Sequence, residues 1–305
     1  MIALKTFFSS LGQVVRAPFT LAAVLILTII TVLPFGLVMG SRLQSALNDQ
    51  PPVMLGSEEI DADWWLEFRR HARGLDATFT PAIIGFAAPL SNLSALLDGT
   101  PQGWVMAGPI ALAMATWAFI WGWAIERFRN GGSRNASALI RAGFRTWPIF
   151  MMISVAAALA QIVLFFTVHA LLFGPVFATL TSTMTRERDA FIVRVFLYLI
   201  FGAFLAVVSV IADYSRIAAV LRGSSGATFV RRWWPSVTAL LLTTAVVLGL
   251  LLIAYGVGET YGGSRVAGWR GVAIGQTFII VRLALRLVTI AAEVDLYQRL
   301  AHSRG

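Results

Sequence analysis

The segment Val237-Thr-Ala-Leu-Leu-Leu-Thr-Thr-Ala-Val-Val-Leu-Gly-Leu-Leu-Leu-Ile-Ala-Tyr-Gly-Val257 contains no charged residue and decides the fold. An α-helix rises about 1.5 Å per residue, so about 20 apolar residues cross the roughly 30 Å hydrocarbon core of a bilayer. Five other stretches are similarly long and apolar, with three arginines as their only charged residues. These are residues 19–39, 104–125, 148–173, 190–211 and 272–292. The sequence therefore predicts an all-α, polytopic bundle of six transmembrane helices, forming one membrane domain over residues 1–305.

The charged residues of the chain are few and unevenly distributed. Hydrophobic residues make up 58% of the chain and charged residues 13%, about half the charged fraction of soluble domains. With a cytoplasmic N-terminus, the inner segments hold 13 basic and four acidic residues, and the outer segments hold eight and 11. Because Lys and Arg concentrate in cytoplasmic loops, both termini are expected in the cytoplasm. The net charge of +9 then indicates contact with anionic lipid headgroups, and no nucleic-acid partner is expected.

The odd-numbered spans begin alike. Arg145-Thr-Trp147-Pro148 opens the third span and Arg232-Trp-Trp234-Pro235 the fifth, whereas Arg16-Ala-Pro18 opens the first without a tryptophan. Proline suits the first position of a helix, tryptophan is enriched at the membrane interface, and arginine pairs with lipid phosphate. The predicted interface anchors are therefore Arg145, Trp147, Pro148, Arg232, Trp234 and Pro235.

The even-numbered spans also end alike, each with an acidic residue followed by an arginine. The three ends are Glu126 to Arg129, Asp213 to Arg216 and Asp295 to Arg299. This repetition predicts three helical hairpins, each entering from the cytoplasm and returning to it, related as parallel repeats.

Two inner connections combine arginines with aromatic side chains, over residues 134–147 and 216–234. We expect amphipathic helices that lie flat at the membrane interface, with turns supplied by Gly131-Gly132 and by residues 223–226. The alternative is a docking site for a cytoplasmic protein partner.

One sizeable loop, residues 41–103, is inserted in the first hairpin and is expected on the periplasmic side. Residues 64–71 form a predicted short amphipathic helix within it. Residues 79–97 are uncharged and apolar, but prolines and a polar amide argue against a seventh span. We expect this stretch to be interfacial or re-entrant.

Few residues carry recognisable chemistry. The chain has no cysteine and three scattered histidines, and it contains no nucleotide-binding, metalloprotease or serine-hydrolase motif. No catalytic residue, metal site or cofactor is therefore predicted.

Polar residues at membrane depth are the remaining candidates for a site. Arg282 and Arg286 lie within the sixth predicted span, where an unpaired arginine is costly, so both are expected to face the bundle interior. Asp213 is the first expected partner of Arg286, with Glu126 and Glu293 as alternatives, and Arg282 is expected to use backbone carbonyls, Gln161 or water. The full candidate set is Arg282, Arg286, Asp213, Gln161, His169 and Gln276. It is interpreted either as a site for an anion or a lipid headgroup, or as an internal ion pair that fixes helix assembly.

The chain resembles an uncharacterised group of bacterial six-helix inner-membrane proteins. The matching stretches are residues 16–18, 61–68, 213–220, 282–286 and 293–298. More loosely, inner amphipathic segments that lead into hairpins are similar to the membrane domain of some glycerophosphodiester phosphodiesterases, whose catalytic domain has no counterpart in this chain. The resemblance implies the fold and a location in the inner membrane of a bacterium, and it assigns no functional residue.

These observations favour a non-enzymatic membrane protein with a structural, assembly or accessory role, together with a possible protein partner. The alternative is a transporter or channel for a small anion or lipid. An intramembrane enzyme comes third, because no nucleophile and base can be assembled from these residues.

Overall fold

A computed structural model describes residues 2–48, 66–67, 70–71, 107–129, 135–221, 223, 225–258 and 269–302. All regular secondary structure in these residues is helical, which confirms the all-α prediction. The helices are α1 (Ile2–Val15), α2 (Pro18–Asn48), α5 (Ala107–Phe128), α6 (Ala136–Leu164), α7 (Phe177–Thr181), α8 (Glu187–Leu221), α9 (Gly226–Arg232), α10 (Trp234–Gly258) and α11 (Trp269–His302). Two π-helical turns, Phe165–His169 and Leu172–Val176, continue the path of α6 toward α7.

Five helical segments in the described residues are long and apolar enough to cross a membrane. They are Pro18–Arg42, Ala107–Phe128, Ala136–Thr181, Glu187–Leu221 and Trp234–Gly258. Large apolar side chains stay exposed along them, including Phe19 at 88% and Phe166 at 80%, and soluble proteins rarely expose so much contiguous apolar surface. The chain is therefore a multi-pass membrane protein. The sixth predicted span falls on α11, which is not one of these five segments.

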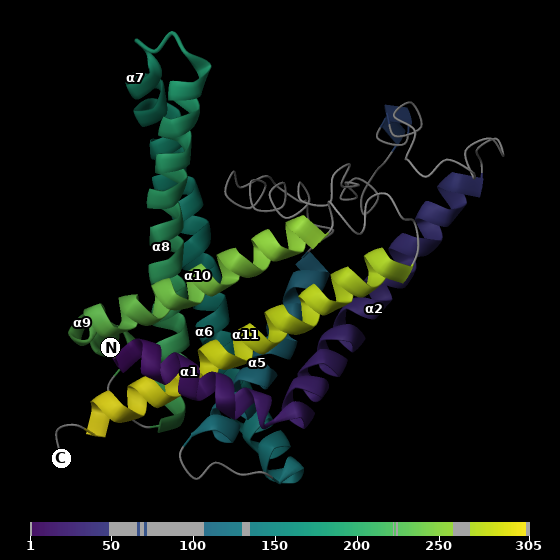
Figure 1. Ribbon diagram of the computed structural model, residues 1–305, viewed down its shortest axis with the longest axis vertical. Coiled ribbons are helices and arrows are strands. Elements are labelled where there is room, and N and C mark those ends of the chain that lie inside the picture. The colour runs from purple at the N-terminus through teal and green to yellow at the C-terminus, as the bar shows by residue number, and fades with distance from the viewer. Residues whose placement is uncertain are drawn as a thin grey trace.

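The helices are arranged as crossing pairs (Figure 1). Helix α6 runs beside α8 and α10 runs beside α11, while α2 contacts α5. The α10–α11 pair crosses α6 and α8 at an angle, so the outer parts of the two pairs diverge. Helix α1 packs on both α11 and α10. The packed core therefore lies where the pairs cross and near the chain termini, whereas the diverging ends expose their apolar side chains.

Helices α5 and α6 approach each other closely. A Cβ atom at Gly122 would lie 3.1 Å from the Cα atom of Gly143 and would overlap the hydroxyl of Thr146. Small residues allow such close contact between membrane helices, where the hydrophobic effect gives little driving force for association. The indole Nε1 of Trp147 also donates a hydrogen bond of 2.9 Å to the carbonyl oxygen of Ala115. Close packing of their backbones and this hydrogen bond therefore stabilise the contact between α5 and α6.

The second half of α11 is the most deeply buried segment of the described chain. Leu287, Ala291 and Leu296 are fully buried, and the ring of Tyr297 packs 4.4 Å from that of Phe229 on α9. A Cβ atom at Gly223 would overlap the Tyr297 hydroxyl, so a larger residue there would displace the tyrosine ring. The C-terminal half of α11 is therefore a central packing element.

The predicted helix start at Pro148 is wrong. Helix α6 begins at Ala136, where the Asn135 side chain accepts a hydrogen bond from the backbone of Ser137, and Pro148 lies inside the helix. Residues 136–147 therefore continue into the span and do not form a separate flat helix. The start of the other predicted flat segment, residues 216–221, is likewise the end of α8, and only α9 is a separate short helix. By contrast, Pro18 is the first residue of α2 and Pro235 the second of α10.

Most of the predicted outer loop lies outside the described residues, including the stretch 79–97. Helix α2 continues to Asn48, so the start of the predicted loop is helical. In the predicted helix 64–71, Leu66, Glu67, Arg70 and His71 are helical. The His71 Nδ1 atom lies 3.0 Å from the carbonyl oxygen of Glu67, one helical turn away.

Candidate functional site

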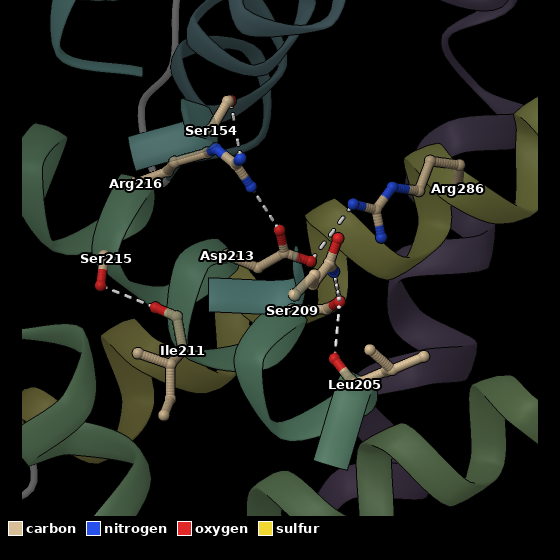
Figure 2. Close-up of polar contacts among 9 residues, drawn as sticks. Ser154, Leu205, Ser209, Ile211, Asp213, Ser215, Arg216 and Arg286 are labelled. Carbon is tan, nitrogen blue, oxygen red and sulfur yellow. Dashed lines mark hydrogen bonds and ion pairs between the residues drawn. The ribbon is translucent and has the colours of Figure 1, made fainter. Parts of the chain in front are cut away.

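A charge cluster formed by Asp213, Arg216 and Arg286 lies where α8 and α11 meet (Figure 2). Arg216 Nη1 donates to Asp213 Oδ1 at 2.6 Å, and Arg286 Nη2 donates to Asp213 Oδ2 at 3.2 Å. Asp213 is 5% exposed and Arg216 8% exposed. Such charges are costly to bury unless they are paired and hydrogen-bonded, and here each carboxylate oxygen accepts from one guanidinium group.

Two further helices contribute to the charge cluster. Arg216 Nη2 donates to the Ser154 hydroxyl on α6 at 2.9 Å. The guanidinium carbons of Arg216 and Arg286 each lie 5.2 Å from the ring centroid of Trp121 on α5. An arginine within about 6 Å of an indole ring gains roughly 0.5–2 kcal/mol, depending on desolvation. The charge cluster therefore connects α5, α6, α8 and α11.

The acid–arginine ends of the even spans all form ion pairs. Arg216 follows Asp213 by three positions on α8, a spacing that places both on one helix face. The same spacing of three residues places Arg129 Nη2 3.0 Å from Glu126 Oε1 at the end of α5. On α11, Arg299 Nε lies 2.8 Å from Asp295 Oδ1. The hydrogen bond to Asp295, with the charge of that carboxylate, raises the pKa of the Arg299 guanidinium.

A cleft of about 490 Å³ opens beside the charge cluster. Its polar side chains are those of the charge cluster together with Ser154, Gln161 and Ser209. Its apolar wall comes from α5 and α6 and consists of Ile110, Ala113, Met114, Trp117, Trp121, Ala157 and Ala158, with Ala212 added by α8. The cleft is therefore lined by the charge cluster together with an apolar wall.

The structure confirms one of the two predicted arginine positions. The ion pair expected between Arg286 and Asp213 is present, whereas Glu126 pairs with Arg129 instead. The expectation that Arg282 faces the bundle interior is wrong, because its side chain is exposed. Helix α11 runs at an angle to α8 (Figure 1), so a residue one turn closer to the N-terminal end of α11 lies farther from α8.

The remaining predicted polar residues are separated from one another. Gln161 lines the cleft, and its Nε2 donates to the Ser209 hydroxyl on α8 at 3.3 Å. Gln276 is exposed on α11. His169 ends the first π-helical turn and stacks on Phe173 with ring centroids 4.5 Å apart. Its ring also meets Phe201 edge-on at 5.1 Å, so the described surroundings of His169 are mainly aromatic.

The predicted interface anchors take different positions. Arg145, Pro148, Arg232, Trp234 and Pro235 are exposed. Trp147 is 39% exposed, and its indole N–H donates to Ala115 on α5. Trp147 therefore has a packing contact in addition to its predicted place at the interface.

A second concave region lies at the predicted cytoplasmic side. It has a volume of about 750 Å³ and is lined by residues from α5, α6 and the end of α8. We call it the inner hollow, and its charged side chains are Glu126, Arg129, Arg141 and Arg145. With three arginines and one glutamate, the inner hollow carries a formal charge of +2.

Sequence reasoning missed Trp121 and Ser154 as members of the site. Both lie in predicted spans, where one tryptophan or serine among apolar residues gives no signal of its own. Arg216 was recognised only as part of a repeated span end. In the described residues, no group of three or more His, Cys, Asp or Glu side chains is placed to hold a metal ion.

Comparison of the chain with protein-family models, curated proteins and solved structures finds no match.

Proposed function

We propose that this chain is a non-catalytic integral membrane protein with a structural, assembly or accessory role. The observation that carries the proposal is the mutual pairing of Asp213, Arg216 and Arg286 between helices that meet at one point. Paired charges of this kind fix how helices assemble, because a wrong arrangement leaves a buried charge without its partner. The charge cluster would then hold a rigid bundle that presents surfaces to other membrane components.

The proposed setting is the inner membrane of a bacterium, with six spans and both termini in the cytoplasm. Helix α11 would be the sixth span, since it follows α10 and lies beside it. Three related hairpins, α2–α5, α6–α8 and α10–α11, are proposed from the repeated span ends and from the contacts within each pair. The proposed relation to the group of six-helix inner-membrane proteins rests on sequence stretches alone.

The proposed lipid contacts are on the cytoplasmic side. The inner hollow, with Arg129, Arg141 and Arg145 around Glu126, supports binding of anionic headgroups there. Helix α1 supports an interfacial position for the N-terminus, because Phe8 and Val15 are exposed at 62% and 70% while its other face packs on α11.

The accessory role is tested by isolation of the protein in mild detergent. We expect a membrane or cytoplasmic protein to be recovered in constant stoichiometry with the chain. An Asp213→Ala variant, which removes the shared carboxylate of the charge cluster, should reduce that recovery if bundle assembly supports the partner. Repeated isolation of the wild-type chain alone, in several mild detergents, would contradict the accessory role.

The second candidate function is transport of a small anion or lipid. The specific observation in its favour is the cleft, in which the side chain of Arg286 is 39% exposed next to an apolar wall. Binding sites near the middle of a bundle, between repeats, are typical of transporters. No specific observation favours the third alternative, an intramembrane enzyme.

Water access to the cleft distinguishes the two candidates. A cysteine at Ala157, which lines the cleft, should react with a membrane-impermeant thiol reagent if the cleft is hydrated. Ala156, its exposed neighbour on α6, provides the control, because a cysteine facing lipid should not react. Equal protection of both positions would favour the structural role.

A further inference from the structure

A smaller cavity of about 120 Å³ shares three residues with the cleft: Ser209, Asp213 and Arg286. Its other walls come from α8, α10 and α11, whereas the cleft is walled largely by α5 and α6. We call this space the inner cavity. The ion pair between Asp213 and Arg286 therefore borders two separate spaces, one toward α6 and one toward α10.

Three polar atoms that line the inner cavity are buried without a hydrogen-bond partner in the described structure. They are the Tyr214 hydroxyl, Thr244 Oγ1 and Glu293 Oε2. Tyr214 is 1% exposed and Glu293 5% exposed. Buried polar groups are almost always satisfied by protein or by ordered water. At roughly 30 Å³ per water molecule, the inner cavity has room for about four, with partners on three helices.

With both carboxyl groups ionised, the two negative charges of Asp213 and Glu293 balance the two positive charges of Arg216 and Arg286. Arg216 adjoins the inner cavity through its hydrogen bond to Asp213. Helix α10 contributes the Thr244 hydroxyl and no ionisable side chain to the cavity lining. Helix α1 also packs on α11, but its Lys5 is exposed. An additional anion would leave one uncompensated negative charge in a desolvated region, which is costly.

Arg286 is placed to accept such an anion. Within the described contacts its Nη2 donates to Asp213 (Figure 2), and its partly exposed side chain lines the cleft. The remaining N–H groups of a guanidinium suit carboxylate, phosphate and sulfonate oxygens. The wall of Ile110, Met114 and Ala157 beside it suits an alkyl chain. The ligand class that fits is an amphiphile with a singly charged anionic headgroup.

We propose that the cleft binds the anionic headgroup of an amphiphile at Arg286 and that Glu293 takes up one proton when the ligand binds. A hydronium ion or buffer acid in bulk solution releases the proton, which passes through the inner cavity and bonds to the carboxylate oxygen Oε2. The added negative charge is thereby balanced, and the one bond that breaks is the bond that held the proton in the donor acid. This inference rests on the second candidate function, the handling of a small anion or lipid.

The test uses the purified full chain in weakly buffered neutral detergent solution, with hexane-1-sulfonate as the probe. A sulfonate stays ionised at neutral pH, so any proton taken up belongs to the protein. We expect saturable binding with about one proton per ligand in the wild type. Glu293→Gln should abolish the proton uptake, while Glu126→Gln, which changes a carboxylate outside the inner cavity, should keep it. Equal uptake by wild type and Glu293→Gln would overturn the role of Glu293.

Four further outcomes decide the rest of the inference. Methanesulfonate lacks the alkyl chain, so equally strong binding of this anion would contradict the requirement for an amphiphile. 1-Hexanol lacks the anionic group, so equally strong binding of this alcohol would contradict the requirement for a charged headgroup. Absence of saturable binding would remove the anion site itself, and binding without proton uptake would remove only the coupling.

An infrared measurement on the wild type avoids dependence on a folded variant. Ligand addition should produce the C=O band of a protonated carboxyl group, and carbon-13 labelling of glutamate should shift that band. A band that does not shift would place the proton on an aspartate and overturn the assignment.

Discussion

The guanidinium of Arg286 lies 3.2 Å from the carboxylate of Asp213, although the two residues are 73 positions apart in the chain. Their ion pair lies between the cleft and the inner cavity. It is also the one place where α11 is bound to α8 by an ion pair among the described residues. The stability of the bundle and the proposed ligand site therefore depend on the same contact.

Substitution of the charge cluster should reveal unequal and non-additive effects. Arg216→Ala should lower the free energy of unfolding by about 3–5 kcal/mol, because it leaves the buried Asp213 carboxylate short of its closest partner. Arg286→Ala should cost less, since its side chain is 39% exposed against 10% for Arg216. Thermal unfolding in detergent provides the measurement. Combining Asp213→Ala with Arg216→Ala should cost less than the sum of the two, and strict additivity would contradict the shared interaction.

The contact between α5 and α6 should not tolerate a methyl group at Gly122. A Cβ atom there would meet the Gly143 and Ala142 backbone at 3.1 and 3.3 Å, and the backbone can move only by separating the helices. Gly122→Ala should destabilise the protein by about 1–3 kcal/mol. Gly202→Ala on α8 is the control, because nothing lies within 4 Å of its Cβ position. That variant should leave stability unchanged or raise it, since alanine favours the helix.

The hydrogen bond of Trp147 should make this residue more important for stability than Trp234. Trp147→Phe removes the 2.9 Å hydrogen bond to Ala115 but keeps much of the aromatic surface, so we expect a loss of about 0.5–1.5 kcal/mol. Trp234→Phe, at an exposed predicted anchor, is the matched comparison. Similar melting temperatures of the two variants would indicate that Trp147 acts only through its interfacial position.

Anionic lipid should bind at the inner hollow. The double variant Arg141→Ala/Arg145→Ala removes two of its three arginines. At about 1 kcal/mol per arginine, it should weaken retention of phosphatidylglycerol by about 25-fold. Native mass spectrometry of the protein with a defined lipid mixture measures the retained fraction. Arg186→Ala/Arg188→Ala, at the other end of the α6–α8 pair, should retain lipid like the wild type.

The orientation in the membrane can be measured with single cysteines, because the chain has none of its own. Cysteines at Ser57, Ser137 and Ser224 are to be probed with an impermeant thiol reagent on intact spheroplasts. The excess of basic residues in the inner segments predicts labelling at position 57 and protection at positions 137 and 224. The opposite labelling pattern would mean that the protein is inverted.

The sequence by itself determined the helical membrane class and part of the charge cluster. Long apolar segments must satisfy their backbone hydrogen bonds internally within a bilayer, and an α-helix does so whatever its neighbours. A buried arginine needs an acidic partner, so Arg286 and Asp213 were matched by their similar depth near the inner ends of their spans. The ion pairs at the three acid–arginine span ends join residues three or four positions apart on the same helix. Helix geometry alone brings such residues together, without any tertiary contact.

The tertiary structure alone decided which side of each helix faces the others. Arg282 and Arg286 are one turn apart, yet only Arg286 reaches α8, because the angle at which α11 crosses the bundle depends on packing all along its length (Figure 1). The same packing brings Trp121 against both arginines and leaves Glu293 beside the inner cavity. Pro148 likewise lies within a continuous helix, since packing of α6 on α5 outweighs the local preference of proline for a helix start. Helix crossing angles arise from many weak contacts between distant segments, and no single stretch of sequence encodes them.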